Sequence, residues 1–403
     1  MVLHSTNMSN SYTIGETFVG AGGAHLGFKQ AGFNTVFVND IDKDTISTLL
    51  LNNVIDKDKC FTCPIEDLDD KQLHEMKIDV LFGGIVCKGF SLAGVRNPFD
   101  PRNYLYKEQL RLVNILKPKV SIIENVVAIK NMILYQHCKE TASAFEEYTK
   151  LSDISKQLNG EKSSKRKSNE DYSDIRNEIN EHKKKMKEIL DSIDKYKYSV
   201  IDDIKRMYAE IGYRVYEKVM QTDHYGGYTN RKRIIIVAVS NDITAEFEYP
   251  VETEDRKTVN DALNLIQYNG INNPDVDVDN RPMNHHVKTV DRFKLIPEGS
   301  NIADVVEDMP DELKISKFYS RGNTQRLDRN KPAPTLVPGH SNFAIHPWEH
   351  RSITVREAAT ITGFPIDYKF HGSHTSRCIQ IGNAVPVQLS YAIANSVKKL
   401  LDS

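Results

Sequence analysis

Short apolar runs alternate with amphipathic stretches over the first 136 residues. The amphipathic stretches have the spacing of helices, and the apolar runs have the length of buried strands. We expect strands at Tyr12–Val19, Asn34–Val38, Asp79–Phe82 and Val120–Ile123, and again at Tyr213–Val219 and Ile234–Val239. This alternation predicts an α/β fold with a doubly wound, mostly parallel sheet.

Residues 137–200 interrupt the alternation with a highly charged segment. Apolar residues and one histidine recur there at alternating spacings of four and three: Ile175, Ile179, His182, Met186, Ile189, Ile193 and Tyr196. This heptad spacing predicts a long helix with one apolar seam. A weaker stripe runs from Phe145 to Leu158, and polar residues 159–171 separate the two. We therefore expect an inserted helical hairpin.

The expected loop of this hairpin is basic. It carries Lys162, Lys165, Arg166 and Lys167. These side chains either contact phosphates or simply face solvent, and the pattern leaves both interpretations open.

The remaining chain contains one region of different composition. Residues 241–325 are rich in loops, Asn and Asp, which indicates a smaller second domain, and helix signals return at Thr354–Thr362 and Gln388–Leu401. We expect the α/β domain to comprise residues 1–136, 201–240 and 326–403, with the hairpin at 137–200 and the smaller domain at 241–325.

Composition and charge exclude several classes of protein. The chain has 403 residues, 39% hydrophobic and 27% charged, with a net charge of −2. A bulk polycation is excluded, so a nucleic-acid partner would need a local basic surface. No apolar run reaches membrane-spanning length, and the N-terminus lacks a signal-peptide pattern. With only five cysteines, we expect a cytoplasmic protein that does not associate with membranes.

A glycine cluster follows the first expected strand. Gly20, Gly22 and Gly23 let the backbone turn sharply and approach a ligand beside a helix N-terminus. Asp40 ends the next strand, where a carboxylate suits paired ribose hydroxyls. The pattern favours a nucleoside cofactor, with a plain tight turn as the alternative.

Three further candidates lie at strand ends. Cys87 follows the third strand in a glycine-flanked loop, where a thiol is well placed for nucleophilic work. Glu124 ends the fourth strand, and Arg231 and Arg233 precede a later apolar run. Each has a plain alternative, namely a small buried thiol, a loop-capping carboxylate or a solvated strand entrance. The pair Cys60 and Cys63 lacks matching ligands, so we expect no metal site.

In this order, the motifs resemble those of the cytosine-5 DNA methyltransferases of bacterial restriction-modification systems. The resemblance covers about residues 12 to 400 outside 137–200 and 241–320. It rests on Phe18–Phe28, Cys87 with Gly89-Phe90-Ser91, Glu124-Asn125-Val126, Arg231-x-Arg233, Lys331–Thr335, Thr354–Ala359 and Gly382-Asn383-Ala384-Val385-Pro386.

The resemblance implies a Rossmann-like methyltransferase fold and transfer of a methyl group from S-adenosylmethionine to C5 of a flipped-out cytosine in DNA. Cys87 would form a covalent adduct at C6, and Glu124 would contact N3 and the exocyclic amine. Arg233, with Arg231 behind it, would hold O2 or a neighbouring phosphate. The implied cofactor-binding residues are Phe18, Gly20, Gly22, Gly23, Asp40, Ile41, Glu66, Asn383 and Val385. Asp67 is the alternative to Glu66 as the acid that meets the adenine. Residues 241–325 would recognise the target in double-stranded DNA.

The resemblance further implies a monomer and leaves open whether a separately acting cognate restriction endonuclease accompanies it. The sequence also departs from the family. Val86 and Lys88 flank Cys87 where Pro and Gln are usual, and Tyr228 and Thr229 replace Pro and Gln before Arg231. A tRNA cytosine-5 methyltransferase and a non-catalytic DNA- or cofactor-binding relative stay as alternatives.

Overall fold

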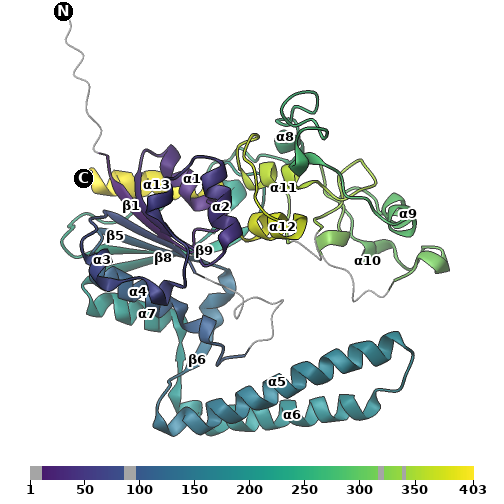
Figure 1. Cartoon of the computed structure of the whole chain (residues 1–403), viewed down its shortest axis with the longest axis horizontal. Coiled ribbons are helices and arrows are strands. Elements are labelled where there is room, and N and C mark those ends of the chain that lie inside the picture. The colour runs from purple at the N-terminus through teal and green to yellow at the C-terminus, as the bar shows by residue number, and fades with distance from the viewer. Residues whose placement is uncertain (1–10, 86–96, 316–321, 338–341) are drawn as a thin grey trace, which may run out of the picture. The chain divides into compact units, whose positions relative to one another are not determined.

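The computed structural model of the chain describes residues 11–85, 97–315, 322–337 and 342–403. These residues form two compact units. The first comprises Met1–Ile85, Arg111–Asn125 and Gly212–Ser403, and the second comprises Val86–Leu110 and Val126–Ile211. The first unit contains the main sheet and the C-terminal helices, and the second contains a long helical hairpin (Figure 1).

A seven-stranded sheet organises the first unit, in the order β3-β2-β1-β4-β5-β9-β8. Its strands are β1 (Thr13–Thr17), β2 (Asn34–Asn39), β3 (Cys60–Phe61), β4 (Val80–Gly84), β5 (Val120–Asn125), β8 (Tyr213–Gln221) and β9 (Lys232–Ser240). The first five strands pair in parallel, and β9 runs antiparallel to both β5 and β8. The predicted mostly parallel α/β sheet is confirmed. The sequence did not predict β3, because two residues carry no periodicity.

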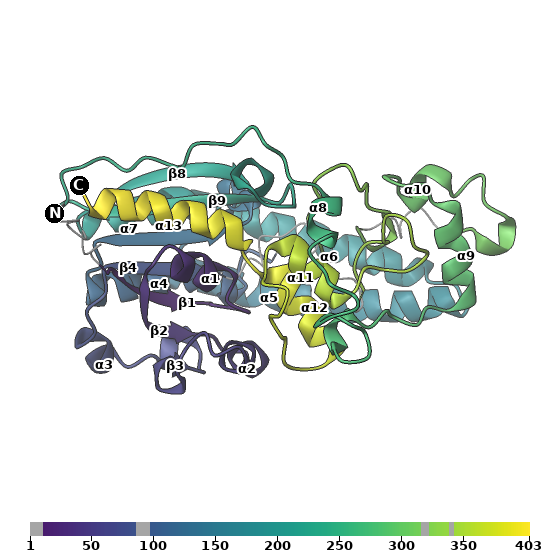
Figure 2. The same ribbon diagram turned by 90° about the horizontal axis from the view of Figure 1, so that it is seen from above.

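Helices cover both faces of this sheet. The helices that connect or follow its strands include α1 (Gly23–Gln30), α2 (Lys43–Leu51), α3 (Asp70–His74), α4 (Leu105–Leu116) and α13 (Val387–Leu401). Helices α1 and α13 lie on one face (Figures 1 and 2), where Phe28 and Leu389 pack against Ile14 of β1. The hydroxyl of Tyr12 donates a hydrogen bond to the carbonyl of Leu401 at 2.6 Å, which ties the end of α13 to the sheet.

The remaining helices of this unit are α8 (Val259–Leu263), α9 (Val287–Leu295), α10 (Ile302–Val305), α11 (Val355–Thr362) and α12 (His374–Asn383). The helices predicted at 354–362 and 388–401 are confirmed. Val259 and Leu263 share an apolar core with Ile361 of α11 and Ile381 of α12. The first part of the region 241–325 therefore belongs to the same compact unit as the seven-stranded sheet.

The Asn- and Asp-rich composition of that region reflects buried polar contacts rather than only solvated loops. Asp277 accepts a hydrogen bond from Arg356 Nε at 2.8 Å, and Asp279 accepts one from Arg377 Nη1 at 2.7 Å. All four side chains are largely buried. A second, smaller apolar cluster, which includes Phe293, Ile296, Ile302 and Met309, holds α9 and α10 together.

The second unit contains α5 (Lys139–Lys167), α6 (Ser173–Ser192), α7 (Val200–Glu210), β6 (Ile133–Tyr135) and β7 (Lys197–Ser199). Helices α5 and α6 confirm the predicted hairpin (Figure 1). Antiparallel β6 and β7 lie at its base, and Phe99, Tyr135 and Tyr148 pack together there.

Two details of the hairpin differ from the prediction. The polar segment expected to be a loop is helical as far as Lys167, so Lys162, Lys165 and Arg166 belong to α5. The turn occurs instead around Asn169, whose positive φ of 57° reverses the chain. The seam residues Ile193 and Tyr196 lie beyond the end of α6. Helix α5 extends further because polar residues with good helix propensity can continue an exposed helix.

Within the described parts of the chain, no helix has the length and apolar character needed to cross a lipid bilayer.

Candidate active site

The turn between β1 and α1 has an unusual backbone. Phe18 has a φ of +52°, which is rare for a residue with a side chain, and Gly20 and Gly22 have φ of +54° and +86°. The amide of Val19 donates to the carbonyl of Asn39 at 3.1 Å, which holds the turn against the end of β2. Strain of this kind is concentrated at ligand-binding sites.

Asp40 is part of the same turn. Its two carboxylate oxygens accept hydrogen bonds from the amides of Gly20 and Asp42, both at 2.9 Å. Burial raises the pKa of Asp40 above its usual 3.8, and the hydrogen bonds from Asp42 and Gly20 offset part of that rise. The next residue, Ile41, is 67% exposed, an unusual exposure for so large an apolar side chain.

The C-terminal loop closes over the start of α1. A Cβ atom on Gly23 would lie 2.0 Å from the carbonyl oxygen of Val385, so only glycine permits this contact. Arg231 donates from Nη1 to the carbonyl of Gly382 at 2.7 Å and from Nη2 to that of Asn383 at 3.3 Å. The guanidinium of Arg231 thus binds the backbone that leads into Val385.

Two residues that sequence reasoning missed support this turn. The hydroxyl of Tyr368 donates to the carbonyl of Ala21 at 2.8 Å. The side-chain amide of Asn39 donates to the carbonyls of Phe61 and Cys63 at 3.0 and 2.9 Å, which brings the end of β3 beside the end of β2. The position of Asn39, directly before Asp40 at a strand end, was an available signal, whereas the local sequence around Tyr368 contained none.

Glu66 lies further along the chain than Phe61 and Cys63, which Asn39 contacts. It is exposed and belongs to the short 3-10 helix Ile65–Asp67. The residue that the structure brings to the end of β2 is Cys63. The assignment of Glu66 to the cofactor stays a prediction.

Glu124 and Arg233 form a nearly buried ion pair. Glu124 Oε1 lies 2.7 Å from Arg233 Nε, and both side chains are 9% exposed. Glu124 is at the carboxyl end of β5 and Arg233 at the amino end of antiparallel β9, so the sheet register alone brings them together. Arg233 Nη1 also donates to the carbonyl of Lys232 at 2.7 Å, which orients the guanidinium.

The end of β4 lies beside this pair. Gly84 is paired with Glu124 in the sheet, and the side-chain amide of Asn125 donates to the carbonyl of Ile85 at 3.2 Å. Cys87 follows two residues later and lies outside the described residues, as do Val86 and Lys88. The last described residues of this segment, Gly84 and Ile85, thus lie beside Glu124 and Asn125.

The groups around the β1–α1 turn fit S-adenosylmethionine. Gly22, where a Cβ would lie 2.5 Å from Leu49 Cδ2, keeps the turn free of side chains. The desolvated carboxylate of Asp40 can accept hydrogen bonds from ribose hydroxyls, and Ile41 offers an apolar surface for a purine. A backbone turn, a carboxylate and an apolar side chain together suit a nucleoside cofactor.

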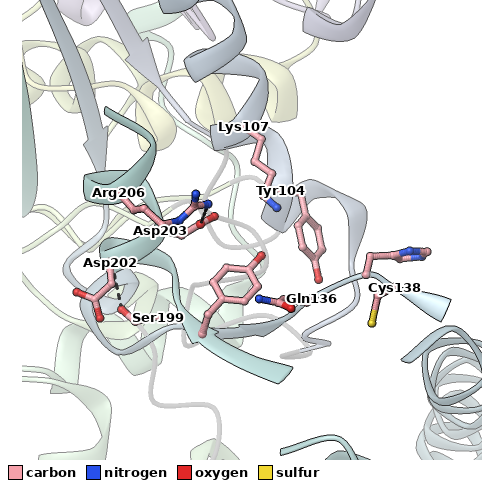
Figure 3. Close-up of a pocket in the computed structure, with 10 residues that line it drawn as sticks. Tyr104, Lys107, Gln136, Cys138, Ser199, Asp202, Asp203 and Arg206 are labelled. Carbon is pink, nitrogen blue, oxygen red and sulfur yellow. Dashed lines mark hydrogen bonds and ion pairs between the residues drawn. The ribbon is translucent and has the colours of Figure 1, made fainter. Parts of the chain in front are cut away.

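The second unit contains a separate cavity of about 750 Å³, which no predicted site residue lines (Figure 3). The ammonium of Lys107 lies over the rings of Tyr104 and Tyr198, at 5.5 and 5.6 Å from their centroids. Tyr106 donates to Asp203 at 2.6 Å, and burial together with this bond raises the pKa of Tyr106 above its usual value. These contacts hold β7 and α7 to the start of α4.

Comparison with known proteins identifies the family of this chain. The family model of the C-5 cytosine-specific DNA methylases matches residues 12–149 and 191–399. The chain is 29% identical to the Type II methyltransferase M.Eco47II of Escherichia coli over 413 residues, covering 98% of this chain and 81% of that protein. It is also 29% identical to M.PspPI of a Psychrobacter strain, with the same coverage.

A crystal structure of a protein encoded within an Escherichia coli prophage has the same fold, with a TM-score of 0.63 and 21% sequence identity. The match covers 98% of this chain and 100% of that protein. The family match extends over both strands of the Glu124–Arg233 pair and over the glycine turn. This chain therefore belongs to the C-5 cytosine-specific DNA methylase family, as a DNA cytosine-5 methyltransferase that uses S-adenosylmethionine.

Proposed function

We propose that this enzyme methylates C5 of a flipped-out cytosine within a specific sequence of double-stranded DNA, through a covalent bond between Cys87 and C6. The observation that supports this most directly is the ion pair of Glu124 and Arg233 beside the end of β4. An acidic acceptor and a fixed guanidinium at one point match the amine, N3 and O2 edge of cytosine.

Cytosine C5 is a poor nucleophile until a group adds to C6. The thiolate of Cys87 supplies that group, and its electron pair forms the new S–C6 bond while the ring density shifts to C5. Glu124 holds the exocyclic amine and N3 and stabilises a proton on the ring. Arg233 holds O2. A free cysteine is only a few per cent thiolate at neutral pH, and the positive charge of Lys88 favours the thiolate.

When bound, S-adenosylmethionine would supply the methyl group that the activated C5 takes up, and S-adenosylhomocysteine would be left. Phe18, Gly20, Gly22 and Gly23 would shape its pocket, Asp40 would accept hydrogen bonds from its ribose, Ile41 would cover its adenine, and Asn383 and Val385 would close the pocket. Loss of the C5 proton to a base then lets the S–C6 bond break, which releases 5-methylcytosine and the thiolate. Flipping the base costs a few kcal/mol, which contacts in the pocket offset.

The hydrogen bonds of Arg231 support a positioning role for this residue behind Arg233, rather than a direct contact with the substrate. Its guanidinium is already bound to the carbonyls of Gly382 and Asn383. Arg231 would therefore act through the loop that closes on Gly23.

Residues 241–325 are proposed to select the target sequence, because the family places its variable recognition segment there. The similarity to Type II methyltransferases supports a role in a bacterial restriction-modification system, with a separate endonuclease of the same specificity. We propose that the enzyme acts as a cytoplasmic monomer. Methylation-resolved sequencing of DNA from cells that express the chain would identify the target.

A mechanism-based trap tests the role of Cys87. With 5-fluorocytosine in the target, fluorine cannot leave C5 as a cation, so the enzyme should stay attached to DNA under denaturing conditions when S-adenosylmethionine is present. Cys87→Ala should lose both the adduct and methylation while it keeps DNA affinity. Glu124→Gln should form the adduct much more slowly.

Fluorinated RNA in parallel distinguishes a tRNA substrate. Trapping on RNA but not on DNA would contradict the proposed substrate. Methylation by Cys87→Ala, or methylation of ordinary DNA by a parent enzyme that never traps, would contradict the covalent mechanism.

A further inference from the structure

Most of the α5–α6 hairpin is an addition to the common family fold. The family model leaves residues 150–190 unmatched. This part of the chain contains long exposed helical surfaces with many charged side chains. Its role is therefore not explained by the methyl-transfer site.

The facing sides of the two helices are set by direct contacts. Ser155 Oγ lies 3.2 Å from His182 Nδ1, which makes these two residues level in the antiparallel pair. Towards the base of the hairpin, Tyr148 packs in one cluster with Ile189. Towards its tip, the ammonium of Lys162 lies 5.9 Å from the ring centroid of Tyr172. The buried seam thus has one register along the whole hairpin.

This seam determines where the charged side chains lie. A helix turns about 100° per residue, so Arg176, Lys183 and Lys187 lie along one flank of α6, about a quarter-turn from the seam. Lys156 occupies the flank of α5 on the same side of the antiparallel pair. Because Ser155 is level with His182, Lys156 and Lys183 lie across the seam from each other. All four side chains are exposed, and we call them the basic face.

By the same geometry, the opposite side of the hairpin carries mainly negatively charged side chains. We call it the acidic face, and its carboxylates are Glu140, Glu147, Glu161, Asp174, Glu178, Glu181 and Glu188. The same side has three lysines, Lys150, Lys165 and Lys185, against these seven carboxylates. A surface that only needs solubility has both signs interspersed. The segregation of sign therefore indicates a partner with strong charge.

We propose that the basic face binds phosphates of the duplex DNA that flanks the target cytosine. The proposal rests on the assignment of DNA as substrate. From Arg176 to Lys187 the face extends about 16 Å at 1.5 Å per residue. Duplex DNA carries one charge per roughly 1.7 Å of its axis, so about ten phosphates fall within that length. Lysine contacts of this kind strengthen binding independently of sequence.

A matched pair of variants tests this proposal. Lys183→Gln with Lys187→Gln removes two positive charges from the basic face, and Lys150→Gln with Lys185→Gln removes two from the acidic face. All four lysines are exposed, so both variants should fold and melt as the parent does. Affinity is measured against salt concentration, with a duplex that extends beyond the target on both sides and with one that covers only the target.

On the long duplex, the basic-face variant should reduce the slope of log affinity against log salt by about 1.8, or 0.9 for each lost phosphate contact. The acidic-face variant should leave that slope unchanged, and on the short duplex the three proteins should agree. An unchanged slope in the basic-face variant, or an equal reduction in both variants, would overturn the proposal. Both variants should still methylate the target at saturating DNA. A parent enzyme that fails to methylate DNA would contradict the proposed function instead.

Discussion

The carbonyl oxygen of Val385 occupies the space that any side chain on Gly23 would need, with only 2.0 Å between it and a Cβ atom built there. Residues more than 360 positions apart are thus in direct backbone contact at the cofactor turn. We expect Gly23→Ala to push the C-terminal loop away, because the obstacle is backbone and cannot rotate aside. Overpacking of this kind costs about 1–3 kcal/mol of unfolding free energy.

The same change should weaken binding of S-adenosylhomocysteine by at least roughly tenfold, which corresponds to about 1.4 kcal/mol, as measured by titration calorimetry. Gly270→Ala is the control, because its nearest neighbours lie 3.4 Å or more from a Cβ atom. Unchanged affinity in Gly23→Ala would show that the contact with Val385 does not shape the cofactor pocket.

The ion pair of Glu124 and Arg233 should couple stability to catalysis. Arg233→Gln leaves the nearly buried carboxylate of Glu124 without its partner, so we expect a loss of about 3–5 kcal/mol of unfolding free energy. The double variant with Glu124→Gln should regain part of this, because no buried charge is left. Both variants should lose methylation.

Denaturant unfolding and a methyl-transfer assay test this prediction together, with the exposed neighbour change Lys232→Gln as control. A double variant as unstable as Arg233→Gln alone would contradict the buried-charge explanation. An active double variant would show that the pair serves stability only.

The buried ion pair of Asp277 and Arg356 should make the Asn- and Asp-rich region contribute to the stability of the protein. Arg356 is 1% exposed, and Asp277→Asn removes the charge that it faces. We expect a loss of about 3 kcal/mol of unfolding free energy. This value is at the low end of the range for breaking a buried ion pair, because Asp279 still lies 3.7 Å from the guanidinium of Arg356. Chemical denaturation measures it. Asp275→Asn, at an exposed position nearby, should change stability by less than about 0.5 kcal/mol.

Cys378 should make stability fall in alkaline solution. Burial raises the pKa of its thiol from 9.0 to about 11. The unfolded chain loses this proton at lower pH than the folded chain. The stability that the buried neutral thiol contributes to the folded state is therefore fully present below about pH 9 and is lost as the pH rises from 9 to 11. The shift corresponds to roughly 2–3 kcal/mol.

Cys378→Ala should be less stable than the parent at neutral pH because of the lost packing, and this difference should shrink as the pH rises above 9. Denaturant unfolding at several pH values between 8 and 11 provides the comparison. A constant difference would contradict the shifted pKa.

Gly160 lies in the middle of α5, and nothing lies within 4 Å of a Cβ atom built on it. Gly160→Ala should therefore stabilise the hairpin by about 0.5–1 kcal/mol, because alanine loses less backbone entropy in a helix. Hydrogen exchange of the α5 amides measures the local effect. Faster exchange in the variant would contradict this prediction, because it would mean that the added methyl group disturbs a contact of Gly160.

The sequence predicted six strands of the sheet and the two C-terminal helices nearly to the residue, because alternation between apolar runs and amphipathic segments is local information. The heptad spacing likewise predicted α6. The predicted end of α5 was wrong, because polar residues such as Lys162 can continue an exposed helix as readily as they can end it. The short strand β3 had no pattern to predict it.

What the sequence by itself determined is the order of motifs, and with it the glycine turn, Asp40 and the strand-end positions of Glu124 and Arg233. Tertiary structure alone decided which of these meet. Antiparallel β9 inserts beside β5 and brings Arg233 to Glu124 across more than a hundred residues, while Arg231, two residues earlier, turns to the carbonyls of Gly382 and Asn383. Such contacts depend on strand order and close packing, which are set by the whole core rather than by the spacing of neighbouring residues.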